Sequence, residues 1–223
     1  MANCLVTGGN RGIGLALCKL LAQRGEHVIA TCRESSPELE ALDVRVEKGI
    51  DVGDPEAIER LAQSLSGERL DWVINNAGVM RRDALGKLHG ETLEGLYLQL
   101  RINAVGPLLV TQALRDNLQE GAKVGIVSSR MGSIEDNTSG GSYGYRMSKA
   151  AVNAAGKSLA MDLKERGIAV AILHPGYVRT DMVGGGGDVE PETAAAGLIA
   201  RMDDLKLETT GRFWHAKGEP LPW

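Results

Sequence analysis

The sequence predicts an α/β fold in which a doubly wound parallel β-sheet of about seven strands carries helices on both faces. Short apolar, β-branched runs alternate with helix-like stretches along the chain, which is typical of βαβ units. Right-handed crossovers then make a doubly wound sheet the most economical topology. The length of 223 residues, without internal repeats and with only 184–187 resembling a linker, predicts one domain over residues 1–223.

Each expected element follows from a local pattern. Short apolar, β-branched runs predict the strands, at residues 4–7, 27–31, 44–50, 72–75, 124–127, 169–173 and 212–214. The first helix follows from the apolar face of Ile13, Leu17, Leu20 and Leu21. Another helix begins at Asp54-Pro55, a capping aspartate with proline at the first helical position. Long helices are predicted over 93–118, with a kink near Gly106-Pro107, and over 142–166, and a last helix from Pro191.

The composition excludes several kinds of partner. A net charge of −4 and a pI near 5.6 provide no basic surface for nucleic acid. No apolar run approaches the length of a membrane span, and the first residues lack a signal-peptide pattern, so we expect a cytoplasmic protein. Cys4, Cys18 and Cys32 contain no Cys-x-x-Cys pair, and the four histidines are scattered. We therefore expect buried thiols and no bound metal.

A glycine-rich turn follows the first strand, and the first helix begins within it. The turn reads Thr7-Gly8-Gly9-Asn10-Arg11-Gly12-Ile13-Gly14. Glycines allow a tight turn and close approach to a pyrophosphate, whose charge is met by the free amides and the dipole of the helix. A turn that is rich in glycine only for packing is the alternative. The position between the first strand and the first helix favours a dinucleotide site.

The end of the second strand indicates which nucleotide binds. Enzymes that prefer NAD usually place an acid there, on the ribose 2′-hydroxyl. Here Cys32 stands at that position, followed by Arg33. Arg33, together with Arg11 of the glycine turn, could pair with a 2′-phosphate, which favours NADP(H) over NAD(H). Glu34 is the counter-argument, because it lies at about the spacing expected of the acid, although past the end of the strand.

Tyr145 and Lys149 form the most informative pair in the chain. They are four residues apart, so on a helix they lie on the same face and can act on one ligand. A free tyrosine has a pKa of about 10, too high for efficient proton transfer near neutral pH, and a neighbouring ammonium lowers that pKa. Tyr143, six residues from Lys149, points elsewhere. A chance pairing remains the alternative for these two residues alone.

Seven ordered motifs together resemble the short-chain dehydrogenase/reductase family, a family of Rossmann-fold oxidoreductases. They are Thr7 to Gly14, Asp51-Val52, Asn75-Asn76-Ala77-Gly78, Asn103, Ser128-Ser129, Tyr145 to Lys149 and Pro175-Gly176, and they cover essentially the whole chain. Residues 128–134 and 142–149 look most like the C-factor and sniffer-like carbonyl reductase group.

The resemblance implies a role for each matching residue. Tyr145 gives a proton to a carbonyl oxygen that Ser129 polarises, and Ser128 packs beneath. Lys149 holds the nicotinamide ribose and lowers the phenol pKa, and Asn103 helps to hold a water that connects Lys149 to solvent. A backbone hydrogen bond inside the helix is the alternative for Asn103. The cofactor-binding residues that the resemblance implies are Gly8, Asn10, Arg11, Gly12, Ile13, Gly14, Arg33, Asp51, Val52, Asn76, Ala77, Gly78, Tyr145, Lys149, Pro175, Gly176, Val178 and Thr180.

Two segments are expected to line the substrate pocket. Residues 130–144 are rich in Gly, Ser and Asn, and residues 177–190 are shorter than in many relatives and contain Gly184 to Gly187. The four glycines suggest a hinge that opens the pocket, or a flexible surface loop.

These features predict an NADPH-dependent oxidoreductase that interconverts a small carbonyl compound and its alcohol. The first alternative is a nucleotide-binding signalling protein of the C-factor type, although it would not need to retain a proton donor. A sugar-nucleotide epimerase or dehydratase is the second, but about forty residues after Thr180 leave little room for its substrate domain. The two long helices resemble those that the family uses for dimers, so we expect a homodimer or homotetramer, with Leu96, Leu100 and Val152 as candidate contacts. Burial of these three residues within the monomer is the alternative.

Overall fold

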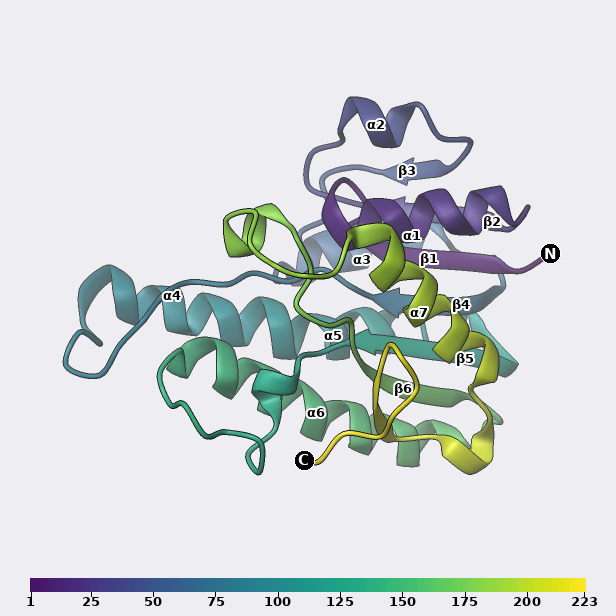
Figure 1. Cartoon of the computed structure of the whole chain (residues 1–223). Coiled ribbons are helices and arrows are strands. Elements are labelled where there is room, and N and C mark those ends of the chain that lie inside the picture. The colour runs from purple at the N-terminus through teal and green to yellow at the C-terminus, as the bar shows by residue number, and fades with distance from the viewer.

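All seven strands of the chain lie in one parallel sheet in the order β3-β2-β1-β4-β5-β6-β7. The computed structural model describes residues 1–223 (Figure 1). The strands are β1 (Asn3–Thr7), β2 (His27–Thr31), β3 (Arg45–Glu47), β4 (Leu70–Asn75), β5 (Leu118–Val127), β6 (Ala169–His174) and β7 (Arg212–His215). The order reverses beside β1, which confirms the predicted doubly wound fold.

Helices cover both faces of this sheet. They are α1 (Gly12–Gln23), α2 (Pro37–Glu40), α3 (Pro55–Ser64), α4 (Gly90–Leu100), α5 (Gly106–Ala113), α6 (Tyr143–Lys164) and α7 (Pro191–Asp204). A π-helical turn, η1 (Arg101–Val105), joins α4 to α5, and short 3-10 turns follow β5, β6 and α7 at η2 (Arg130–Gly132), η3 (Asp181–Val183) and η4 (Leu207–Thr209). In Figure 1, α1 and α7 lie in front of the sheet, with α3 behind it.

The strands separate two hydrophobic cores because successive side chains point to opposite faces. On β1, Leu5 belongs to the core beneath α3, α5 and α6, whereas Cys4 and Val6 belong to the core beneath α1 and α7. All three side chains are completely buried. Burial on both faces explains why the strands read as continuous apolar runs.

Helix starts follow the predicted capping chemistry where the sequence carries it. The Asp54 side chain accepts a 3.1 Å hydrogen bond from the amide of Glu56, and Pro55 opens α3. Ser36 caps α2 in the same way through the amide of Leu39. That single-turn helix was not predicted, because four residues are too few to show helical periodicity.

The long helix predicted over 93–118 differs from the structure in two respects. Its interruption begins at Arg101 as a π-helical turn, ahead of Pro107, which lies within the first turn of α5. The helix also ends at Ala113, and Leu118 pairs with Leu70 in the sheet. Apolar residues in 114–118 suit either element, and pairing with β4 decides the outcome.

Three further expectations can be compared with the structure. Leu96 and Val152 are buried inside the chain, so they are wrong as contacts with a second copy. The three cysteines are free and buried. No helix combines the length and apolarity needed to cross a bilayer.

Candidate active site

The carboxyl ends of the parallel strands meet at one edge of the sheet and bring the predicted residues together. Thr7, the last residue of β1, accepts hydrogen bonds of 3.0 Å through Oγ1 from the amides of Asn76 and Ala77. The Asn76 side chain donates in return to the main-chain oxygens of Thr7 at 3.0 Å and Gly8 at 3.3 Å. These bonds hold the turn after β4 against the glycine turn after β1.

The glycines of this turn are needed for close approach. A Cβ at Gly14 would overlap the main-chain oxygen of Gly8 and lie 2.6 Å from Nδ2 of Asn76. Gly8 and Gly12 have φ of 70° and 53°, in the left-handed region, and a Cβ at Gly12 would lie 3.2 Å from Cγ2 of Thr180. The turn therefore packs tightly, as the packing alternative requires, while bringing Thr180 beside it.

The start of α1 fits an anionic group. Its N-cap residue, Arg11, makes no capping hydrogen bond through its side chain, and the first turn of the helix contains no acidic residue. The first amides of a helix have no partners within it and carry the positive end of the dipole. They are therefore suited to the pyrophosphate of a dinucleotide.

Arg11 and Arg33 supply positive charge beside this turn. Both side chains are exposed, and neither takes part in an ion pair. Cys32, at the position of the expected acid, is buried, and Glu34 is exposed. The arrangement suits a phosphate group at the end of β2.

Asp51 and Val52 follow β3 at the same edge. Oδ1 of Asp51 accepts a 2.8 Å hydrogen bond from the amide of Gly53, and Val52 is buried. A Cβ at Gly106 would lie 3.0 Å from the main-chain oxygen of Val52, so α5 packs closely against this turn. Asn103 lies on the π-helical turn η1, directly before α5, and so belongs to the same edge of the sheet.

The side chain of Asn103 makes three hydrogen bonds. Its Oδ1 accepts from the amide of Val79 at 2.8 Å, and its Nδ2 donates to the Val79 oxygen at 2.8 Å and to the Ser148 hydroxyl at 3.0 Å. A Cβ at Gly78 would lie 3.2 Å from Oδ1 of Asn103 and 3.9 Å from Nζ of Lys149. Gly78 thus lies between the side chains of Asn103 and Lys149. The hydrogen bonds of Asn103 connect the turn after β4, through Val79, to α6, through Ser148.

Tyr145 and Lys149 lie one turn apart near the start of α6, as predicted. Nζ of Lys149 is 5.7 Å from the centroid of the Tyr145 ring and donates a 2.9 Å hydrogen bond to the main-chain oxygen of Val127. Burial of the ammonium lowers the pKa of Lys149 to about 8. Lys149 is therefore charged at neutral pH and loses its proton just above it.

The pKa of Tyr145 differs from the expectation. Burial raises it above the usual value because it disfavours the phenolate, and the neighbouring Ser129 side chain offsets this only in part. Lys149, which the resemblance expects to lower the pKa of the phenol, is not among the causes of the shift. The phenol is consequently protonated at neutral pH.

The two adjacent serines have different surroundings. The Ser128 hydroxyl donates a 2.5 Å hydrogen bond to Oδ1 of Asn153 and is buried beneath α6. The Ser129 hydroxyl accepts a 3.1 Å hydrogen bond from the amide of Met131, and it lies near enough to Tyr145 to lower the pKa of the phenol. Ser129 is therefore the serine that the structure brings to the phenol.

The segment after β6 returns to the glycine turn. Val178 is buried and forms an isolated parallel bridge with Val189, which closes residues 177–190 into a loop. Pro175 and Gly176 begin this segment next to His174, the last residue of β6. Three of the four consecutive glycines, Gly184, Gly185 and Gly187, have positive φ.

Asp83 is a residue near the site that was not predicted from the sequence. Its carboxylate accepts hydrogen bonds of 2.5 Å and 2.7 Å from the amides of Tyr143 and Gly144, the first residues of α6. An acid at this helix end satisfies free amides and opposes the helix dipole. No local pattern reveals it, because sixty residues separate the partners.

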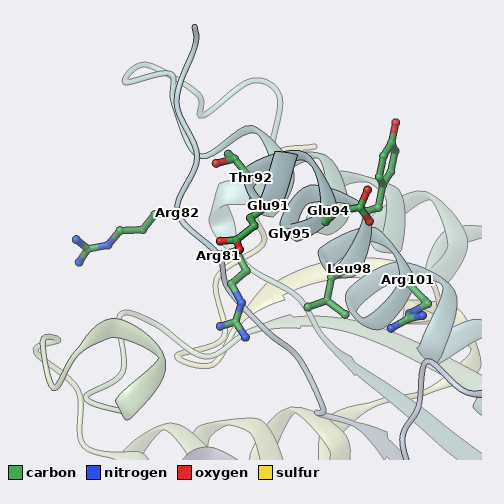
Figure 2. A pocket seen from close by; sticks show the side chains of 9 residues that line it. Arg81, Arg82, Glu91, Thr92, Glu94, Gly95, Leu98 and Arg101 are labelled. Atoms are coloured by element: carbon green, nitrogen blue, oxygen red, sulfur yellow. The ribbon is translucent and has the colours of Figure 1, made fainter. Parts of the chain in front are cut away.

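A separate cavity of about 630 Å³ lies on the outer side of α4 (Figure 2). It contains neither Tyr145 nor Ser129. Figure 2 shows the Arg82 side chain pointing away from Arg81 and Arg101. The lining residues are Arg81, Arg82, Glu91, Thr92, Glu94, Gly95, Tyr97, Leu98 and Arg101.

Comparisons with known proteins agree on the family of proteins that this chain resembles. The sequence model of short chain dehydrogenases matches residues 2–188. The chain is 46% identical over 229 residues to 1-hydroxy-2-glutathionyl-2-methyl-3-butene dehydrogenase of Rhodococcus sp. (strain AD45), covering 100% of both chains. It is 42% identical over 157 residues to C-signal of Myxococcus xanthus, covering 69% of this chain and 93% of that protein.

Solved structures provide a similar comparison. The NADPH-bound carbonyl reductase from chicken fatty liver has a TM-score of 0.88 and 31% identity, covering 100% of this chain and 99% of that one. The carbonyl reductase Sniffer of D. melanogaster has a TM-score of 0.90 and 31% identity, covering 100% of both.

Proposed function

The chain belongs to the short-chain dehydrogenase family and is an oxidoreductase, and we propose that it uses NADPH to reduce an aldehyde or ketone to an alcohol, or catalyses the reverse reaction. The observation that carries this proposal is the grouping of Ser129, Tyr145 and Lys149 beside a glycine turn suited to a pyrophosphate. We propose a small-molecule substrate and a cytoplasmic location.

The cofactor residues remain those that the resemblance implies. The free amides of α1, with Arg11 beside them, would hold the pyrophosphate. Asp51 and Val52 would lie by the adenine, Asn76 by the adenosine ribose, and the segment from Pro175 to Thr180 by the nicotinamide. When bound, the nicotinamide supplies the hydride for reduction.

Proton transfer would depend on residues of this chain. Tyr145, kept protonated by burial, would donate its proton to the substrate oxygen, and the Ser129 hydroxyl would donate a hydrogen bond to the same oxygen. The ammonium of Lys149 would stabilise the phenolate that remains. Asn103 would keep Val79 and Ser148 in place and help to hold a water that connects Lys149 to solvent.

The preference for NADPH is proposed from charge. Arg33 follows β2 with an exposed, unpaired guanidinium, and such a group pairs well with a phosphate. The carbonyl reductase from chicken fatty liver is described as NADPH-bound, which is in line with this choice. Glu34 is exposed as well, and it opposes the proposal only if it turns toward the nucleotide.

A second candidate substrate follows from the relative that aligns over the whole chain. Its name describes the dehydrogenation of an alcohol that carries a glutathionyl group. We therefore propose glutathione conjugates with a hydroxyl group as candidate substrates for the oxidation direction. Residues 130–144 and 177–190 would line the pocket in either case, because the first segment follows Ser129 and the second borders the glycine turn.

The signalling alternative is less favoured. The match to C-signal covers 69% of this chain, whereas the match to the dehydrogenase covers all of it. The chain also retains Ser129, Tyr145 and Lys149, which a protein acting only through partners would not need.

The test is turnover of an aldehyde and ketone panel with NADPH, and of hydroxyl-bearing glutathione conjugates with NADP⁺, by the parent protein and the Tyr145→Phe variant. Loss of the phenol proton should lower kcat by about a hundredfold or more and leave the dissociation constant for NADPH nearly unchanged. Tyr97→Phe, at an exposed tyrosine of α4 outside both pocket segments, is the matched control and should keep most of the activity.

Two results would refute this function. Equal and negligible rates in the parent and Tyr145→Phe proteins, with tight cofactor binding in both, would exclude the oxidoreductase mechanism. Undiminished turnover in Tyr145→Phe would exclude Tyr145 as the proton donor.

A further inference from the structure

The last residue of the chain is tied to the segment that follows Ser129. The main-chain oxygen of Trp223 accepts hydrogen bonds of 2.9 Å from the amides of Ile134 and Glu135, and a third of 3.0 Å from the Ser133 hydroxyl. Figure 1 shows the yellow end of the chain reaching the green loop before α6. Three donors therefore converge on one oxygen, nearly ninety residues away in sequence.

The other side of this contact is anchored in the sheet. The Trp223 ring stacks on Phe213 of β7, with the ring centroids 5.7 Å apart and the planes at 24°. Phe213 is buried and clusters with Ile172 of β6 and with Leu221. The amide of Leu221 donates a 2.9 Å hydrogen bond to the Phe213 oxygen. Trp223 thus links a fixed sheet edge to a loop.

The tied loop leads directly to the candidate catalytic hydroxyl. Oγ of Ser129 accepts from the amide of Met131, and the amide of Gly132 donates to the Ser129 oxygen at 2.8 Å. Gly132 lies flat against α6, because a Cβ there would be 2.6 Å from the carbonyl carbon of Lys149. A shift of residues 133–135 would therefore be transmitted to the 3-10 turn that positions Ser129.

Few other contacts hold this part of the loop. Ile134 is 81% exposed, so apolar packing does not fix it. The Arg130–Asp136 pair is exposed, with its charged atoms 3.4 Å apart, and such pairs contribute little. Arg146 donates to the Met131 oxygen at 3.4 Å and to the Ser139 hydroxyl, on either side of the tied residues. Ser133 is buried, and its amide also donates to the Arg130 oxygen at 2.9 Å, so the contacts with Trp223 are the main anchor of Ile134 and Glu135.

We propose that Trp223 is a positioning residue that clamps the wall of the substrate pocket and keeps the Ser129 hydroxyl aimed at Tyr145. The catalytic part of this inference rests on the proposed function of Ser129. The clamp itself is a structural link between β7 and residues 133–135, and it can be measured without any substrate.

The experiment compares Trp223→Ala with the conservative Trp223→Phe variant. Amide hydrogen exchange at Ile134 and Glu135 reports the clamp directly. An aromatic stack changes an equilibrium constant by about twofold to tenfold, so exchange in Trp223→Ala should be faster by about that factor. Trp223→Phe should recover most of the protection. Lys217→Ala, which changes an exposed residue of the same terminal segment, is the control and should not alter exchange.

Kinetics then test the catalytic consequence. For a carbonyl substrate that the parent protein reduces, Trp223→Ala should lower kcat/KM by about tenfold, with the larger loss for a bulky substrate. The dissociation constant for NADPH should stay within about twofold, because the glycine turn lies on the other strands. Ser133→Ala removes one of the three hydrogen bonds to Trp223, together with the 3.0 Å bond that the Asp136 amide donates to the Ser133 hydroxyl, and it should change both measurements in the same direction.

Each outcome has a distinct meaning. Unchanged exchange at Ile134 and Glu135 in both Trp223→Ala and Ser133→Ala would overturn the clamp. Faster exchange with unchanged kcat/KM would overturn the positioning role. A loss of NADPH affinity as large as the loss of kcat/KM would overturn it as well, because it would indicate that the whole fold had loosened. Absence of turnover in the parent protein would refute the proposed function while the exchange measurement still decides the clamp. If Trp223→Ala fails to fold, Ser133→Ala gives the same decision.

Discussion

The ammonium of Lys149 lies 5.7 Å from the centre of the Tyr145 ring and donates its hydrogen bond to the main-chain oxygen of Val127. Burial acts on both groups in the same sense, favouring the uncharged form of each. It lowers the pKa of Lys149 to about 8 and raises the pKa of Tyr145. A neutral phenol beside an ammonium is the state that carbonyl reduction requires.

The pH dependence of the two reaction directions should differ. Below about pH 8 Lys149 is charged and stabilises the phenolate left by proton donation, and above it this charge is lost. We expect kcat/KM for reduction to fall as pH rises past about 8. Oxidation should increase with pH, because Tyr145 must first lose a proton whose pKa is raised. Initial rates in both directions between pH 6 and 10 test this, and a flat reduction profile would contradict it.

Arg33 should determine the choice between the two cofactors. Arg33→Ala is expected to raise the dissociation constant for NADPH by about tenfold and to leave that for NADH nearly unchanged, because one charge-assisted contact with a phosphate is lost. Isothermal titration with both nucleotides measures this. Arg115→Ala is the matched control, because Arg115 precedes the amino end of β5 and therefore lies at the edge of the sheet opposite to the predicted cofactor site. Equal effects on the two nucleotides, or a parent protein that prefers NADH, would refute the role of Arg33.

His174 should make the fold sensitive to acid. It lies beside His215 at 4.9 Å between ring centroids, and its buried Nδ1 has no hydrogen-bond partner. Burial lowers the pKa of His174 to about 3. Below pH 6.5 the unfolded chain therefore binds a proton that the folded chain does not, so stability falls by on the order of 1 kcal/mol per pH unit until about pH 3.

Urea unfolding at pH 7.5, 6.5, 5.5 and 4.5 measures that loss. His174→Gln should flatten the dependence, and His27→Gln, at an exposed histidine, should not. A His174→Gln protein that loses as much stability with acid as its parent would show that other groups are responsible.

Association into a homodimer or homotetramer remains a prediction, now with different contact residues. Tyr97, Val105 and Leu108 are exposed along α4, η1 and α5 at helical spacing. We expect the Val105→Asp, Leu108→Asp double variant to be a monomer by analytical ultracentrifugation, because two charges would be buried in the contact. Leu85→Asp, at an exposed loop residue, is the control. A monomeric parent protein, or an unchanged assembly in the double variant, would refute this surface.

The sheet and most helices could be predicted because their patterns are local. Alternating apolar segments mark β1 and β2, and a capping aspartate with proline marks α3. Motif order, which depends on resemblance, located the residues that the structure gathers at the sheet edge. Their catalytic and binding roles stay predictions until they are tested.

Other features could not be predicted because they depend on distant parts of the chain. Asp83 meets the start of α6 across sixty residues, and the anchoring of Trp223 depends on Phe213 and Ser133. Burial of Tyr145 and Lys149 depends on packing around them, so the direction of the Tyr145 pKa shift was wrong from the sequence. Leu118 carries the same apolar signal in a helix or a strand, and only its pairing with Leu70 distinguishes them.

The π-helical turn around Asn103 restricts how this chain can change its length. A single π turn accommodates one residue more than an α-helical turn while winding through nearly the same angle, so η1 keeps the faces of α4 and α5 in phase. Inserting or deleting one residue in the regular part of α4 or α5 would instead rotate everything on one side of it by about 100°. Either Asn103 would then turn away from Val79, or the buried face of α5, including Val110, would turn toward water. Length changes that loops of this protein would tolerate are therefore expected to be selected against on either side of this turn.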